Sequence, residues 1–239
     1  VMDDGSWQVA TMNVDGTGLR ILTSTAGFAE TPDWSPDDDW LVYSNAPVKC
    51  STDDWSACIT QNGERYTITR MSADGSDPQP IGERDTVDWE PRLSPDGTKV
   101  VFSRFHVPDG LQTLVVRDLA SGDEHESTGR TLDLEHPDWS PDGRWIVYNP
   151  TCAPGTGPCE QIERVPADDL NAKPVILYAA DDAHAGIKPA YSPDGSRITF
   201  GCMGPLCVMD ADGTNVATLV EVPGTELNHF AWGRLAQGG

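Results

Sequence analysis

Basic residues are scarce in this chain. Its 239 residues include 16 Lys and Arg against 38 Asp and Glu, which gives a formal net charge of −22. A nucleic-acid-binding protein needs clustered cations to contact phosphates, and an anionic membrane surface repels so acidic a chain. We therefore expect no nucleic acid among its partners. The acidic surface can instead steer a basic partner toward the protein.

Long apolar runs are also missing. A helix needs about 20 apolar residues to span a bilayer, and no run here approaches that length. We therefore expect no direct membrane insertion. The 23 Gly and 19 Pro favour turns and short elements over long helices. With 38% hydrophobic residues, the composition is typical of a folded protein, and we expect a single domain over residues 1–239.

Familiar catalytic motifs are absent. The sequence contains no GxSxG nucleophile elbow, no HExxH zinc motif and no GxxxxGK[ST] phosphate loop. The acidic turn at Asp210 lacks the spacing of an EF-hand calcium loop. We therefore expect no enzymatic activity, no cofactor and no bound metal.

The cysteines form three close pairs. None is a CxxC pair, and no further Cys or His stands at zinc-finger spacing. Each pair follows a strand-like run that ends near an aromatic residue, so a short bridge across a hairpin loop is the simplest interpretation; buried unpaired thiols are the alternative. Three disulfides indicate an extracytoplasmic protein that is periplasmic, displayed on the cell surface or secreted. The predicted bridges join Cys50 with Cys58, Cys152 with Cys159 and Cys202 with Cys207.

One motif recurs along the chain. Each copy combines a Ser-Pro-Asp-Gly-like turn, in which Pro presets φ and Gly accepts positive φ, with a following stretch that alternates with the period of a β-strand. A fifth, partial copy is HFAWGRL (229–235). The four full copies are TPDWSPDDDWLVYS (31–44), EPRLSPDGTKVVFS (90–103), HPDWSPDGRWIVYN (136–149) and KPAYSPDGSRITFG (188–201).

Each repeat continues into a third strand, a second turn and a short fourth strand. The third-strand segments are 8–18, 66–77, 114–124, 161–169 and 206–215. Four short antiparallel strands every ~40–50 residues are typical of a β-propeller blade. A β-sandwich would not explain the repeated motif.

The PxWSPDGxxIxF signature resembles the WD40-like PD40 repeats of TolB-type propellers, and it covers nearly the whole chain. The resemblance implies an all-β propeller of four-stranded antiparallel blades and a non-catalytic scaffold of the cell envelope. Five first-strand motifs favour five blades, with the ring closed by joining the N- and C-terminal strands. Six blades, as in TolB itself, is the alternative.

The connections between blades lead into the innermost strands, so the residues before the Pro of each motif should ring the mouth of the central channel. Convergent polar groups beside an aromatic wall make a plausible pocket. The long 45–65 insertion on the same face adds Trp55 as a candidate contact. The expected mouth residues are Glu30, Thr31, Trp89, Glu90, Glu135, His136, Lys188, Asn228 and His229.

We consider three alternative functions for this face of the propeller. The leading hypothesis is a non-catalytic module that binds a protein or peptide partner, either alone or as a subunit of a larger envelope complex. The second is a sensor that binds a small molecule, a glycan or a metal at the channel mouth. The third is a metal-assisted lyase or hydrolase built on the channel histidines, His136 and His229.

Overall fold

A computed structural model gives the architecture of the chain. It describes residues 6–46, 66–82, 86–106, 109–129, 133–151, 161–179, 186–202 and 204–221. All regular structure in these ranges is β-strand. Accordingly, no helix that could cross a bilayer occurs in this part of the chain.

Four sheets of four antiparallel strands form the body of the protein, and each sheet uses four strands that are consecutive in sequence. The first two sheets contain β3 (Phe28–Trp34), β4 (Trp40–Ala46), β5 (Thr67–Ser72) and β6 (Gln79–Pro80), then β7 (Val87–Leu93), β8 (Lys99–His106), β9 (Leu111–Asp118) and β10 (Glu124–Glu126). The other two contain β11 (Asp133–Trp139), β12 (Trp145–Thr151), β13 (Ile162–Pro166) and β14 (Val175–Tyr178), then β15 (Ile187–Tyr191), β16 (Arg197–Gly201), β17 (Leu206–Asp210) and β18 (Ala217–Val220).

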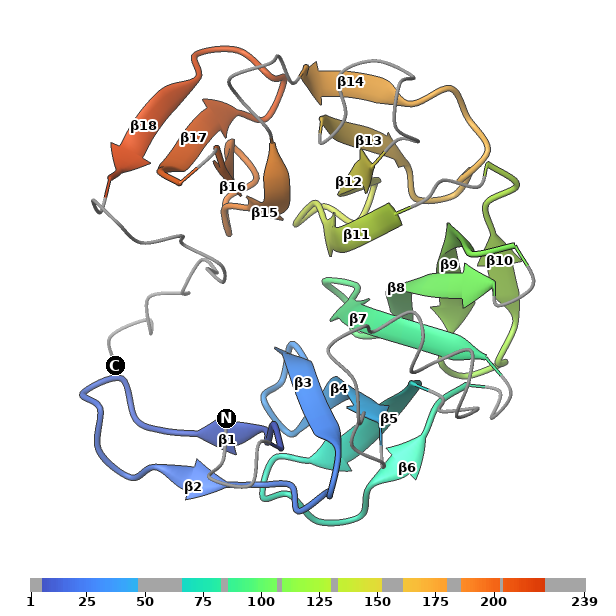
Figure 1. Cartoon of the computed structure of the whole chain (residues 1–239), viewed down its shortest axis with the longest axis vertical. Helices are drawn as coiled ribbons and strands as arrows, with labels where there is room; N and C mark the ends of the chain where they lie inside the picture. The colour runs from blue at the N-terminus through green and yellow to red at the C-terminus, as the bar shows by residue number, and fades with distance from the viewer. Residues whose placement is uncertain are drawn as a thin grey trace.

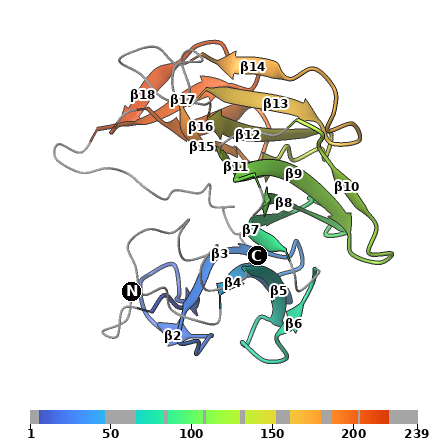
Figure 2. The same ribbon diagram turned by 45° about the vertical axis from the view of Figure 1, so that its right-hand side comes forward.

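The sheets stand as blades around a central opening. Strands β3, β7, β11 and β15 lie innermost, and β6, β10, β14 and β18 lie at the rim (Figure 1). An oblique view shows the same passage from inner to outer strand (Figure 2). Consecutive inner strands contact one another, β3 with β7, β7 with β11 and β11 with β15. The predicted β-propeller of four-stranded blades is therefore confirmed.

A further pair of strands precedes the first blade. Strands β1 (Ala10–Thr11) and β2 (Arg20–Ile21) form a two-stranded sheet, and a bridge from Trp7 to Phe28 ties this region to β3. These strands fall where the sequence predicts the third and fourth strands of an incomplete blade. The predicted closing strand at 229–235 lies outside the described residues, so a ring of five blades stays a prediction.

Apolar side chains fill the spaces between blades. Each large cluster joins two consecutive sheets, because the second strand of every blade is buried on both faces. Val42 and Ile68 of the first blade, for example, pack against Leu93 and Phe102 of the second. Burying both faces of each sheet against its neighbours is what makes radial stacking favourable.

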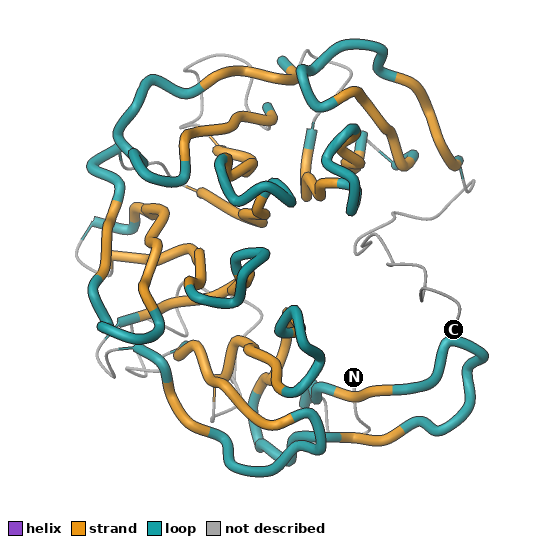
Figure 3. The backbone as a smooth tube through the Cα atoms, turned by 180° about the vertical axis from the view of Figure 1, so that it is seen from behind, coloured by secondary structure: helices purple, strands orange, loops and turns teal. Residues whose placement is uncertain are grey.

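The repeated turns have one geometry in all four blades. The Ser hydroxyl donates to the Asp carboxylate two residues later at 2.6 Å, and a backbone N–H five residues after the Ser donates back to the hydroxyl. The fourth residue of the Ser-Pro-Asp-Gly turn has positive φ, 69° to 71° at three glycines and 60° at Asp38. Seen from behind, these turns gather around the central opening (Figure 3). The predicted turn chemistry is confirmed.

One predicted disulfide falls within the described residues. Cys202 and Cys207 are bonded, with their Cα atoms 5.9 Å apart, and they link the ends of β16 and β17.

The other two predicted disulfides are not tested by the structure. Cys50 and Cys58 both lie outside the described residues. Cys152 and Cys159 lie outside them as well. Their bonds therefore stay predictions. In sequence, each of these pairs falls in the connection between the second and third strands of its blade, which is also where the Cys202–Cys207 bond lies.

Candidate binding site at the channel mouth

A β-bulge interrupts the inner strand of every blade at the same point. The register shifts in β3, β7, β11 and β15 all fall around the residue before the motif Pro. That residue has φ between 51° and 56° in each blade, a left-handed conformation that is uncommon outside glycine. Bulges re-aim side chains and are frequent beside functional sites. The four residues are Thr31, Glu90, His136 and Lys188.

The bulges of the second, third and fourth blades are each held by the preceding blade. The backbone N–H of Glu90 donates to the Ser44 hydroxyl at 2.9 Å, and that of Lys188 donates to Asn149 Oδ1 at 3.0 Å. The hydroxyls of Ser44 and Thr31 also lie 2.8 Å apart. A polar side chain therefore crosses each of these joints and satisfies a backbone donor that the bulge leaves outside the sheet ladder. The left-handed residues are consequently fixed in position.

Glu90 and His136 form a buried ion pair between the second and third blades. Glu90 Oε1 lies 2.7 Å from His136 Nδ1, and Glu90 Oε2 accepts the backbone N–H of His136 at 2.5 Å. His136 Nε2 lies 3.4 Å from Glu135 Oε2. The imidazole thus stands between two carboxylates, of which Glu135 is the more exposed, with 39% of its side chain accessible.

Electrostatics reinforce this pair. Burial alone would lower the pKa of His136, but the charges of Glu90 and Glu135 outweigh it and raise that pKa above its ordinary value. Burial would likewise raise the pKa of Glu90, but the imidazolium holds it below its ordinary value. Both groups are therefore charged in mildly acidic solution.

A third carboxylate, that of Glu30, interacts electrostatically with Glu90 and takes a hydrogen bond from Tyr66. Burial raises its pKa, and the negative charge of Glu90 raises it further. A cation placed near Glu30 would reverse this effect and favour the ionised form. Glu30, Glu90, Glu135 and His136, called the mouth cluster below, therefore form a site whose carboxylates can accept hydrogen bonds from an ammonium or guanidinium group.

The remaining expected mouth residues have different positions. Lys188 takes its place at the fourth bulge. Trp89 is only 6% exposed and packs between Tyr66 and Phe105 in the core of the first two blades. Because its ring is buried in this core, Trp89 does not form the expected aromatic wall, whereas Glu30 and Glu135, at the same position of their own repeats, are only half-buried. Asn228, His229 and Trp55 lie outside the described residues.

The same inner strands carry two half-buried aspartates that the sequence did not single out. Asp33 and Asp138, from the PDW of the first and third repeats, accept backbone N–H groups of the following blade, from Leu93 at 2.7 Å and Tyr191 at 2.8 Å. Burial raises the pKa of Asp138 to about 7. Arg92 partly offsets this rise. The recurrence of Pro-Asp-Trp in the first and third repeats was the available signal.

The described residues contain no group of three or more His, Cys, Asp and Glu side chains arranged to hold a metal ion.

The sequence of the chain is similar to that of another bacterial protein. No protein-family model matches the chain. An uncharacterized protein of Agrobacterium fabrum, Atu1656, is 26% identical over 253 residues, which cover 89% of this chain and 83% of that protein. That protein's own role is undefined, so the similarity assigns no activity here.

Solved structures with the same architecture include two TolB proteins. TolB from Acinetobacter baumannii matches with a TM-score of 0.64 and 17% identity over 86% of this chain and 46% of that one. The chain therefore spans about half of that TolB. A putative TolB from Agrobacterium tumefaciens matches with a TM-score of 0.57 and 24% identity over 87% and 86% of the two chains.

Enzymes share the architecture as well. An oligogalacturonate lyase in complex with manganese matches with a TM-score of 0.60 and 17% identity, over 93% of this chain and 61% of the lyase. At these identities the similarities show the fold and leave the chemistry to the residues of each site. The repeats, the blades and these structures together give the chain a TolB-like β-propeller fold.

Proposed function

We propose that this chain is a non-catalytic binding module whose channel mouth holds a basic segment of a protein or peptide partner. The observation that carries the proposal is the mouth cluster, in which carboxylates from three blades gather around the buried Glu90–His136 pair. Glu135 remains partly exposed beside this pair and is therefore available to a ligand.

Two physical arguments favour a basic partner. Partly buried carboxylates form stronger hydrogen bonds with cationic donors than exposed ones do, because the local dielectric is low. The net charge of −22 also attracts basic molecules at long range and speeds their encounter with the protein. A lysine or arginine side chain, or a free amino terminus, meets both conditions.

The proposed location of the protein is outside the cytoplasm. The Cys202–Cys207 disulfide supports it, because such bonds persist in oxidising compartments. In that setting the module would belong to the cell envelope or be secreted, as the TolB-like fold also suggests.

The proposal includes a closed ring of five blades, in which 229–235 supplies the inner strand of the blade that contains β1 and β2. The support comes from Trp34, which is 41% exposed, whereas its counterparts Leu93, Trp139 and Tyr191 are 6% to 7% exposed. Each counterpart is covered by the preceding blade, so Trp34 marks a face that completion of its own preceding blade would cover. A closed ring would complete the rim of the mouth.

Selection from a random peptide library displayed on phage tests the binding function. We expect the wild-type protein to enrich peptides that contain Lys or Arg, and the Glu90→Gln/Glu135→Gln variant to lose that enrichment. Asp123→Asn/Asp168→Asn removes the same charge from exposed turns and should retain it. Equal enrichment by all three proteins would show that net charge, and not the mouth cluster, selects the peptides.

The same proteins serve a turnover assay, because similar propellers include a lyase. Polyuronates, esters and peptides are incubated with each protein, with and without Mn²⁺ or Zn²⁺. We expect no product. Turnover that disappears in the Glu90→Gln/Glu135→Gln variant would replace the binding function with catalysis at the same site.

A further inference from the structure

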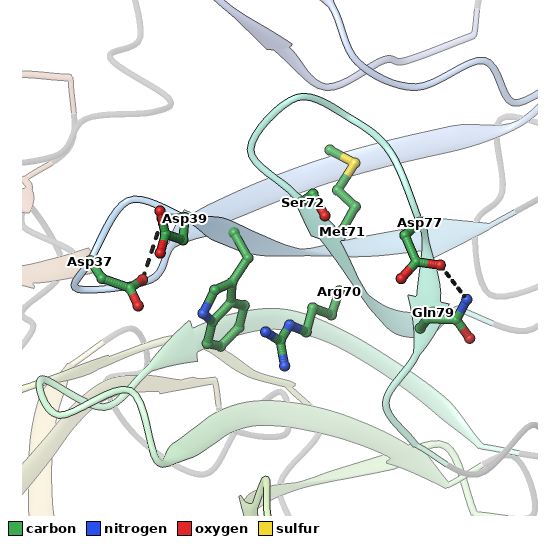
Figure 4. Close-up of a pocket in the computed structure, with 8 residues that line it drawn as sticks. Asp37, Asp39, Arg70, Met71, Ser72, Asp77 and Gln79 are labelled. Carbon is green, nitrogen blue, oxygen red and sulfur yellow. Dashed lines mark hydrogen bonds between the residues drawn. The ribbon is translucent and has the colours of Figure 1, made fainter.

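A second cleft lies in the first blade, apart from the residues of the mouth cluster. Its volume is about 530 Å³, within the range of small-molecule pockets. It lies beside the β3–β4 and β5–β6 turns and is lined by Asp37, Asp39, Trp40, Arg70 and Gln79, among others. Figure 4 shows Arg70 between the carboxylates of Asp37 and Asp39 on one side and Asp77 with Gln79 on the other.

The arginine of this cleft is held in place by an aromatic ring. The guanidinium carbon of Arg70 lies 4.0 Å from the centroid of the Trp40 ring. Stacking on an indole fixes the guanidinium plane and leaves its N–H groups directed outward, as bidentate recognition of a carboxylate requires. Among the described residues, no acceptor takes a hydrogen bond from Arg70, and the side chain is exposed.

The third blade contains the same pair in a different role. Arg164 lies 4.4 Å from the centroid of the Trp145 ring, and its Nη1 donates to the carbonyl of Ala211 in the fourth blade at 2.9 Å. There the arginine fastens two blades together. The corresponding donors of Arg70 are left for a ligand.

A negative group complements Arg70 across the cleft. Asp39 stands where the third blade has Arg144, directly before the stacked tryptophan. The Asp39 carboxylate is exposed and takes no hydrogen bond or ion pair from the described residues. Asp37 and Asp77, in contrast, already accept hydrogen bonds from Ser35 and Gln79. The charge of Arg70 also acts on Asp37, but the N–H groups of Arg70 and the carboxylate of Asp39 have no hydrogen-bond partner among the described residues.

From this arrangement we propose that the cleft binds a small zwitterion, a free amino acid or a dipeptide. Its carboxylate pairs with Arg70 and its ammonium pairs with Asp39. A purely anionic ligand is disfavoured, because three aspartates surround the arginine and the whole chain carries −22. A zwitterion has no net charge and satisfies both groups. This site is separate from the mouth cluster and does not depend on the function proposed there.

Isothermal titration calorimetry with alanine and alanylalanine tests the proposal. We expect at least one of them to bind the wild-type protein, and the comparison shows whether the cleft takes an amino acid or a dipeptide. N-acetylation of alanylalanine removes the ammonium, and C-amidation removes the carboxylate. Each change should weaken binding by at least about tenfold, since each removes a charged hydrogen bond.

Variants locate the site. Arg70→Gln and Asp39→Asn should each lose at least about tenfold in affinity, whereas Arg144→Gln, on the equivalent turn of the third blade, should bind as the wild type does. Both altered side chains of the cleft are exposed, so the variants should melt within a few degrees of the wild type. Absence of heat for both compounds, equal binding of the capped peptides, or unchanged binding by Arg70→Gln would overturn the proposal.

Discussion

At the scale of single residues, the charge of His136 is set by its neighbours. Its pKa is raised and that of Glu90 is lowered, so their attraction stabilises the fold only while both are ionised. The contribution of His136 to the free energy of unfolding is complete below its unfolded pKa of 6.5, and it is lost as the pH rises through the higher pKa of the folded state. The contribution of Glu90 is complete above 4.5 and is lost as the pH falls through the lower folded value.

We expect His136→Gln to lower the free energy of unfolding by about 2 kcal/mol between pH 4.5 and 6.5, the interval between the two ordinary pKa values. The difference from the wild type should shrink toward pH 9. Urea denaturation across this range measures it, with the exposed His125→Gln as the control. A difference that does not change with pH would show that the imidazole is not charged in the folded protein.

Asp138 behaves in the opposite way, because it is buried with little compensating charge. Its pKa of about 7 lies above its unfolded value of 3.8, so the contribution of Asp138 to the stability of the fold is lost as the pH rises from about 4 to 7. Asn at this position can still accept the Tyr191 N–H but cannot ionise. We expect Asp138→Asn to gain on the order of 3 kcal/mol relative to the wild type over this pH range, since one pKa unit is about 1.4 kcal/mol.

The exposed Asp168→Asn serves as the control for the Asp138 comparison in urea denaturation at pH 4 and pH 8. Its stability should follow that of the wild type at both pH values. If the relative stability of Asp138→Asn is the same at pH 4 and pH 8, the buried carboxyl does not titrate in this range.

At the scale of elements, the disulfide stabilises the β16–β17 hairpin. We expect Cys202→Ala/Cys207→Ala to lower the free energy of unfolding by about 2 kcal/mol, because the bond reduces the conformational entropy of the unfolded chain. Thermal unfolding measures the loss. Peptide mapping after alkylation without reduction should find no free thiol at any of the three cysteine pairs, and a labelled pair would contradict the predicted framework.

The sequence predicted these elements well because the information is local. The Ser-Pro-Asp turns and the alternating second strands each depend on residues within about ten positions, and they recur. The bulges were not predicted, since a left-handed residue before Pro is held by a side chain of the previous blade. The burial of Trp89 was not predicted either, because the direction of a side chain next to a bulge depends on such tertiary contacts.

The Arg70–Trp40 contact was not predicted, because it too depends on the tertiary structure. Its members are 30 positions apart on different strands, and the motif gives no sign that an arginine of the third strand stacks on the tryptophan of the second. Its repetition as Arg164–Trp145 becomes visible only when the strands are aligned in space.

At the scale of the whole molecule, closure of the ring should cover Trp34. Hydroxyl-radical footprinting of the intact chain should then modify Trp34 about as slowly as the buried Trp139. Removal of residues 229–239 should accelerate modification of Trp34 and leave Trp139 unchanged, because the latter is covered by the second blade. Equal rates at Trp34 in both proteins would exclude a closing strand at 229–235.

Carbodiimide cross-linking tests binding of a basic segment at the mouth cluster most directly. A selected peptide with a single lysine is bound to the wild-type protein, coupled with the reagent, and the new amide bond is located by tandem mass spectrometry. Because the lysine ammonium is expected beside the mouth cluster, the bond should form at Glu135 or Glu30, and it should disappear with an excess of the same peptide that carries Arg in place of Lys, because the guanidinium binds but does not couple. Bonds scattered over the exposed turn carboxylates, such as Asp123 and Asp168, would contradict binding at the mouth.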